Sequence, residues 1–187
     1  MNAEALEEPL LARWPGPGAV QAVVAPPGAY ARVLRDTCAT LLRQFGQGVL
    51  VTANRPSGTL RAALEQDGVA VGDLHFVDCV SSLTGVQPPP DPKVLHVESP
   101  NLLEKLGMRI DLAARRGGGF VLVDSLSSLA VYNGVPAVNE WTHGLLNRLR
   151  ARGHPVALLV VERQASDELL DGLRPLCDAV VHGAYRA

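Results

Sequence analysis

The chain has 187 residues, which suits one domain of ordinary size. Hydrophobic residues make up 47% and charged residues 19%, and the 4% of aromatic residues leaves a core built mainly from Val, Leu and Ala. The net charge of -2 argues against a general nucleic-acid-binding role and against attraction to an anionic membrane. No apolar run approaches the roughly 20 residues of a membrane helix, and the start of the chain lacks a signal-peptide pattern, so we expect a cytoplasmic protein.

The three cysteines, Cys38, Cys79 and Cys177, are far apart and form no CxxC pair. This spacing indicates neither a disulfide framework nor a zinc site. We expect reduced thiols that are mostly buried.

Short Val-rich runs alternate with longer helical patterns along the chain. In the first half, Pro56 and Gly68 mark the ends of one helix, and Val33, Leu34, Leu41 and Leu42 mark the buried side of another. The elements expected there are strands at 20–25, 48–53, 74–80 and 93–99 and helices at 29–45 and 56–68. The proline-rich stretch 84–92 is expected to be a surface loop.

The second half continues the alternation. The expected helix at 99–119 opens with the cap Ser99-Pro100 and closes on three glycines, and a later helix has Ser166 as its cap. The remaining expected elements are strands at 120–125, 155–162 and 179–185 and helices at 135–153 and 166–178.

Several of these strands are continuous apolar runs, as is typical of parallel strands with helices on both faces. The pattern predicts an α/β fold with a doubly wound, mostly parallel sheet flanked by helices. We expect one domain over residues 20–187, preceded by an N-terminal arm at residues 1–19.

The order and spacing of these elements resemble those of the RecA-like ATPases, most closely of their KaiC-like branch. The resemblance covers about residues 20–183, and its most specific stretches are "VLVTANRPSGTLRAALEQDGV", "LHFVDCVS", "FVLVDSLSSLAVYNG" and "NEWTHGLLNRLRARG". The closest likeness is to KaiC-like proteins known chiefly from archaea, whose role is poorly defined. The resemblance implies a RecA-like sheet and raises the question of ATP hydrolysis.

A phosphate loop requires GxxxxGK[ST] between the first strand and the first helix, because backbone N–H groups, a Lys and a hydroxyl hold the phosphates and Mg²⁺. The matching segment here, "VVAPPGAYARVLRD", has Gly28 but no Lys and no Ser or Thr at the helix start. Pro26 and Pro27 lack an N–H, and Arg32 lies within the helix. We therefore interpret Pro26, Pro27 and Gly28 as a degenerate phosphate-loop segment.

The resemblance also implies acidic residues at the end of the second strand, where they orient the attacking water. This chain has Asn54 there, which accepts no proton at neutral pH. Asp124, followed by Ser125, matches the metal-side acid of a Walker B strand. Two interpretations are open: Asp124 and Ser125 cap the next turn or bond across strand ends, or they retain weak nucleotide or Mg²⁺ binding.

Other candidate groups have weaker patterns. Glu98 and Glu162, also at strand ends, would form a divalent-metal site with Asp124 if the three converged. His75 and His96 are expected on one sheet face but lack ligand spacing. The other candidates divide between helix-docking aromatic residues (Tyr132, Trp141) and helix-end arginines that contact solvent or a partner (Arg115, Arg116, Arg148, Arg152).

These observations favour a non-catalytic pseudo-ATPase that serves as a protein-interaction, assembly or regulatory module. Its partner would be a protein, either a second copy or a related RecA-like subunit, with Arg148 and Arg152 as candidate contacts. The alternative is a nucleotide- or small-ligand-binding sensor that uses the crevice near Asp124 without efficient hydrolysis. An enzyme with unrelated chemistry is the third interpretation, and no nucleophile–base pair supports it. We expect no resident cofactor and no catalytic residue.

Overall fold

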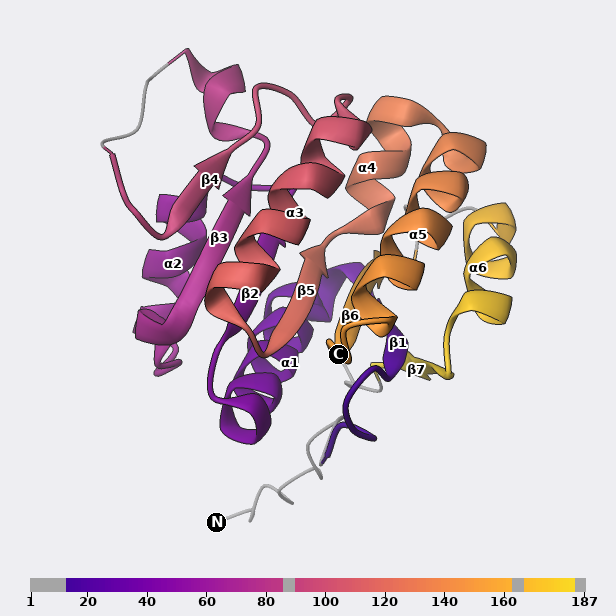
Figure 1. The fold of residues 1–187 in the computed structure, drawn as a ribbon, viewed down its shortest axis with the longest axis horizontal. Coiled ribbons are helices and arrows are strands. Elements are labelled where there is room, and N and C mark those ends of the chain that lie inside the picture. The colour runs from indigo at the N-terminus through magenta and orange to yellow at the C-terminus, as the bar shows by residue number, and fades with distance from the viewer. Residues whose placement is uncertain (1–12, 86–89, 163–166, 184–187) are drawn as a thin grey trace.

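The computed structural model describes residues 13–85, 90–162 and 167–183, and within them one parallel sheet forms the centre of the molecule (Figure 1). The strand order is β4-β3-β2-β5-β6-β1-β7. The strands are β1 (Val20–Ala25), β2 (Gly48–Thr52), β3 (Leu74–Asp78), β4 (Val94–His96), β5 (Phe120–Asp124), β6 (Val156–Val161) and β7 (Ala179–His182). All six strand pairings are parallel, which confirms the predicted sheet.

Helices cover both faces of the sheet. Helices α1 and α2 lie on one face, and α3, α4, α5 and α6 lie on the other, toward the viewer in Figure 1. The helices are α1 (Tyr30–Phe45), α2 (Ser57–Gln66), α3 (Leu103–Gly117), α4 (Leu126–Asn133), α5 (Val135–Arg150) and α6 (Asp167–Leu173). Double coverage buries both sides of the central strands, which explains their continuous apolar sequences.

The alternation of side chains along each strand divides the core in two. Leu50, Phe76 and Leu122 pack under α1 and α2, whereas Val51 and Val123 pack under the helices of the opposite face. Burial of these aliphatic side chains on both faces is the main source of stability, because a buried Val or Leu side chain contributes about 1.5–3 kcal/mol.

The segment before β1 is tied to the first helix through Trp14, which is fully buried with the α1 and α2 core. The Gln44 side chain clamps the Trp14 backbone, accepting from its N–H at 2.8 Å and donating to its carbonyl at 2.9 Å. The Trp14 indole N–H donates to the Ala19 carbonyl at 3.2 Å. The packed part of the chain therefore includes residues ahead of β1.

The start of α3 and the presence of α4 differ from the sequence prediction. Helix α3 begins at Leu103 rather than at the Ser99-Pro100 cap, because the Leu102 N–H bonds to the Ser99 carbonyl at 3.2 Å and closes a turn first. Helix α4 was not expected, and its short Ser-rich sequence carries little helical periodicity. Leu42 packs against the core on the buried side of α1, as predicted, although its side chain is only partly buried. Ser166, the predicted cap of α6, lies outside the described residues, as does part of the proline-rich loop.

His75 and His96 do not share a sheet face. The register pairs Val77 with Leu95 and Asp78 with His96. Because side chains alternate along a strand, His75 points to the face of Val77 and His96 points to the opposite one. His75 packs against the end of α3, where an added Cβ on Gly117 would approach its Nδ1 to 2.5 Å.

In the part of the chain that the structure describes, no helix is both long enough and apolar enough to span a membrane.

Candidate functional site

Asp124, Asn54, Ser128 and Tyr30 meet at the carboxyl edge of the sheet, where open parallel sheets place their sites. Strands β2 and β5 are neighbours, and Thr52 pairs with Asp124 in their register. The residues that follow β2 therefore lie beside the end of β5, and the start of α1 lies over them. The topology brings together residues that are up to 98 positions apart (Tyr30 to Ser128).

Asn54 is the centre of this polar cluster. Its Nδ2 donates to Oδ1 of Asp124 at 3.5 Å and to the Tyr30 hydroxyl at 3.3 Å. Its Oδ1 accepts from the Ser128 hydroxyl at 2.8 Å. Both ends of the amide are thus used, which fixes its orientation across the end of β5.

Ser125 caps α4, since its Oγ accepts from the Ser128 N–H at 3.2 Å. This agrees with the interpretation of Ser125 as a local cap. Its neighbour Ser127 contributes to the sheet edge as well, because its Oγ accepts from the Val161 N–H at 2.9 Å. The serines after β5 therefore join the end of that strand to α4 and β6.

Asp124 is fully buried, and burial raises the pKa of its carboxyl to about 7. No described residue gives its Oδ2 a hydrogen-bond partner. A carboxyl in this setting holds its proton close to neutral pH, because the charged form lacks compensating donors.

The connection between β1 and α1 is the place where a phosphate loop would lie. It consists of Pro26 and a 3₁₀ turn at Pro27–Ala29, and α1 starts at Tyr30. The prolines offer no N–H, and the N–H groups of Ala29 and Tyr30 are used by the carbonyls of Pro26 and Pro27. These residues do not fit a nucleoside triphosphate, because they lack the set of free backbone N–H donors that a phosphate loop supplies.

The three carboxylates proposed for a metal site do not converge. Glu98 is exposed and pairs with Lys105, Glu162 is exposed beyond β6, and Asp124 is buried. Within residues 13–85, 90–162 and 167–183 no group of three metal-ligating side chains forms.

Asp78 is a second buried acid at this edge, and sequence reasoning passed over its role. Its carboxylate accepts from the N–H groups of Ser57 (2.6 Å), Val80 (2.9 Å) and Ser81 (2.8 Å) and from the Ser81 hydroxyl (2.6 Å). Burial opposes ionisation, yet these hydrogen bonds together lower the pKa of Asp78 below its usual value. Asp78 thus holds the start of α2 on the end of β3. The strand-end acid in "VDCVSS" was the available signal.

The arginines predicted as contacts act within the chain. Arg148 Nε donates to Asp111 Oδ2 at 2.8 Å, and Arg152 donates to Asp111 Oδ1 at 3.0 Å. One carboxylate of α3 therefore holds two guanidinium groups at the end of α5. Trp141 packs partly buried beside the same helices, as predicted, and Tyr132 is half exposed.

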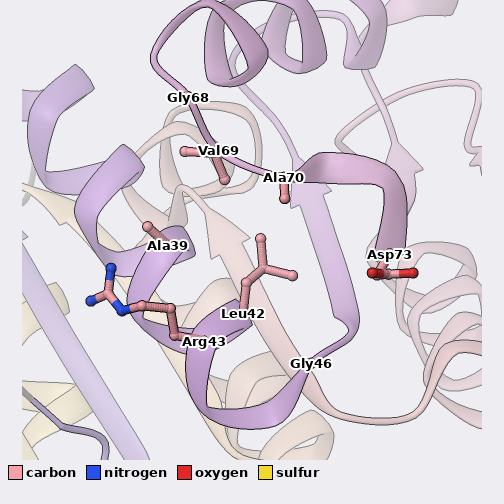
Figure 2. Close-up of a pocket in the computed structure, with 8 residues that line it drawn as sticks. All are labelled: Ala39, Leu42, Arg43, Gly46, Gly68, Val69, Ala70 and Asp73. Atoms are coloured by element: carbon pink, nitrogen blue, oxygen red, sulfur yellow. The ribbon is translucent and has the colours of Figure 1, made fainter.

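A hollow of about 390 Å³ lies at the opposite edge of the sheet (Figure 2). It is bounded by the end of α1 and by the connection from α2 to β3, with Leu42 between Arg43 and Asp73. This is the amino-terminal edge of the strands, away from Asp124, so it does not belong to the cluster around Asn54.

Comparison with solved structures defines the class of fold. FlaH, the flagellar accessory protein of Methanocaldococcus jannaschii, matches with a TM-score of 0.59 and 10% identity over 89% of this chain and 71% of that chain. The KaiC-like protein PH0186 of Pyrococcus horikoshii OT3 matches with a TM-score of 0.56 and 15% identity over 78% and 62%. The chain therefore has the RecA/KaiC-like fold that its sequence resembles.

The chain belongs to DUF7504, a family of unknown function, which matches residues 23–182. No curated protein matches the sequence.

Proposed function

We propose that this protein is a non-catalytic RecA/KaiC-like module that acts through protein interaction. The observation that carries the proposal is the connection between β1 and α1, where Pro26 and Pro27 remove two N–H donors and a 3₁₀ turn uses two more. Phosphate binding at a helix N-terminus depends on free N–H groups, so this connection is a weak cradle for ATP.

The second support is the state of the strand-end acid. Asn54 stands beside Asp124 where an acid would be needed to orient water, and burial favours the protonated form of Asp124. Phosphate cradle and acid–base groups are independent requirements for hydrolysis. This chain is poorly equipped for both requirements, yet its fold remains well packed. This combination favours a function in which its surfaces bind other proteins.

Thermal unfolding with Mg-ATP, Mg-ADP and Mg-GTP tests the proposal. A nucleotide present at 100 times its Kd would add about 2.7 kcal/mol of stability. For a chain of this size that corresponds to a rise in Tm of roughly 5–10 °C. We expect a shift below about 1 °C at millimolar nucleotide, and no phosphate release above background. Nucleotide-dependent stabilisation with hydrolysis would overturn the proposal.

A second candidate, a sensor for a nucleotide or another small ligand, is supported by Oδ2 of Asp124, which has no partner among the described residues. A ligand donor that reached this oxygen would satisfy it. This function predicts that Mg²⁺ or a nucleotide raises Tm without hydrolysis and that Asp124→Asn abolishes the shift.

A further inference from the structure

Helices α3 and α4, which cover the same face of the sheet, carry most of the exposed apolar side chains. Five large apolar residues are exposed in the described part of the chain, and four of them belong to these helices or directly precede α3: Leu102, Met108, Val131 and Tyr132. Met108 is 71% exposed and Val131 is 75% exposed. A concentration of such residues on one face is typical of an interaction surface.

A groove runs between α3 and α5 on this face. It has a volume of about 320 Å³ and is lined by Gly107, Met108, Trp141 and Gly144 together with four charged residues. At Gly107 a Cβ would lie 3.2 Å from the Trp141 Nε1, so a larger residue there would crowd the groove.

A second hollow, of about 470 Å³, extends the groove toward the start of α3. Leu102, Asn133 and Ala137 bound it, and Glu104 borders both hollows. The Asn133 side chain at the end of α4 donates to the carbonyl of Pro100, which lies just before α3, at 3.0 Å. The two hollows share Glu104, and the residues that line them are here called the α3–α5 face.

The net charge of this groove favours a basic partner. Its lining has three acidic residues, Glu104, Asp111 and Glu140, and one basic residue, Arg148. Arg148 is paired with Asp111, whereas Glu104 and Glu140 form no ion pair with any described residue. Carboxylates without partners beside exposed apolar side chains complement Lys or Arg beside apolar side chains. A groove between two helices suits a third helix, whose ridge packs between them.

We infer that the α3–α5 face binds a helix of a partner protein that carries an apolar stripe flanked by Lys or Arg. This inference rests on the proposed function as an interaction module and names its surface and the chemistry of its partner. The apolar stripe covers Met108 and Leu102, and the basic flank reaches Glu104 and Glu140.

Labelled helical peptides of about 18 residues are suitable probes for the full chain. One has a Leu stripe with Lys flanks, a second has the same stripe with Glu flanks, and a third has Lys flanks with Ala in place of Leu. Fluorescence anisotropy gives each Kd. The chain has two tryptophans, so Trp14→Phe leaves Trp141 as the reporter within the groove.

We expect the Leu–Lys peptide to bind at least about tenfold more tightly than either of the others and to change Trp141 emission. Met108→Glu weakens binding about tenfold, and joint replacement of Glu104 and Glu140 by Lys reverses the preference between the Lys and Glu peptides. Leu83→Glu is the matched control, because Leu83 is exposed and lies outside this face, and it leaves Kd unchanged. Circular dichroism and Tm confirm that each variant is folded.

Equal affinity for the Lys and Glu peptides, or binding unaffected by Met108→Glu, overturns the inference. A wild-type dimer that Met108→Glu converts to a monomer also overturns it, because a second copy would then cover the face. If no peptide binds and no nucleotide changes Tm, this inference is wrong and the proposed function stands. Stabilisation and hydrolysis of Mg-ATP would remove the proposed function and leave the peptide result standing.

Discussion

Asn54, just after β2, donates a 3.5 Å hydrogen bond from Nδ2 to Oδ1 of Asp124 at the end of β5. An amide thus stands beside Asp124, where it supplies a donor but no negative charge and no base. This pair sets the chemistry of the carboxyl edge, because a buried acid with a single long hydrogen bond is better kept protonated than ionised.

Asp124→Asn should stabilise the protein at alkaline pH. Burial raises the pKa of Asp124 from 3.8 to about 7, so the folded state holds a proton that the unfolded state has lost between about pH 4 and 7. The contribution of Asp124 to the free energy of unfolding is greatest below pH 4 and falls as the pH rises to 7. Between these two limits the free energy of unfolding drops by on the order of 4 kcal/mol. Urea unfolding from pH 4 to 8 should show the variant gaining a few kcal/mol over wild type at pH 8 and almost nothing at pH 4.

The control for this experiment is Asp171→Asn, because Asp171 is 76% exposed. Its free energy of unfolding should follow that of wild type across the same pH range. If the Asp124→Asn and wild-type curves ran parallel from pH 4 to 8, the raised pKa of Asp124 would be wrong.

Ser125→Ala should cost about 1 kcal/mol, the usual value of an N-cap. The variant loses the Oγ that accepts from the Ser128 N–H and that lies 3.0 Å from the Ser128 hydroxyl. Chemical denaturation measures the loss, and Ser82→Ala, at an exposed position, serves as the control. Equal unfolding midpoints for the two variants would contradict the capping role.

Asp78→Ala should destabilise the protein by about 3 kcal/mol or more, because three buried N–H groups and the Ser81 hydroxyl lose their acceptor. The pKa of Asp78 is lowered in the folded state, so its contribution is present above about pH 4 and is lost as the pH falls through the folded pKa. The difference in free energy of unfolding between Asp78→Ala and wild type should therefore become smaller at acid pH. Asp73→Ala, at an exposed position, should have little effect, and an equal loss for both would refute the assignment.

Gly119→Ala should cost more than about 3 kcal/mol or prevent folding. Gly119 has φ +62°, and an added Cβ would lie 1.7 Å from the Gln47 carbonyl oxygen. This oxygen belongs to the backbone, so it cannot move away without displacing the chain. Gly28→Ala is the matched control, since space around Gly28 is open, and it should change Tm by no more than about 2 °C. A well-folded Gly119→Ala protein with wild-type Tm would show that this turn is wrongly described.

The sequence was sufficient to predict the strands and the layered fold because burial on both faces leaves continuous apolar runs such as 120–124. It was also sufficient to mark Asp124 and Asn54, since both directly follow such runs. It did not predict their contact, which depends on β2 and β5 being neighbours. Asp78 was missed as an organising residue because its partners, Ser57 and Ser81, come from two different connections.

Helix α4 and the start of α3 were harder for a local reason. Helix α4 has eight residues, too few for a clear period, and its cap lies in the serines that end β5. The pairing of Arg148 and Arg152 with Asp111 joins residues 37 and 41 positions apart, and only the packing of α5 on α3 reveals it. Local patterns carry no information on such partners.

The position of β1 between β6 and β7 has a consequence for how the chain reaches its folded state. Strand β1 is synthesised long before β6 and β7, the two strands between which it lies, because Val20 pairs with Val156 and Gln21 with Ala179. Until then the apolar strand VQAVVA has two open edges. Such long-range pairing slows folding and exposes the nascent chain to aggregation, so this half of the sheet should be the last to form and the part most dependent on chaperones during synthesis.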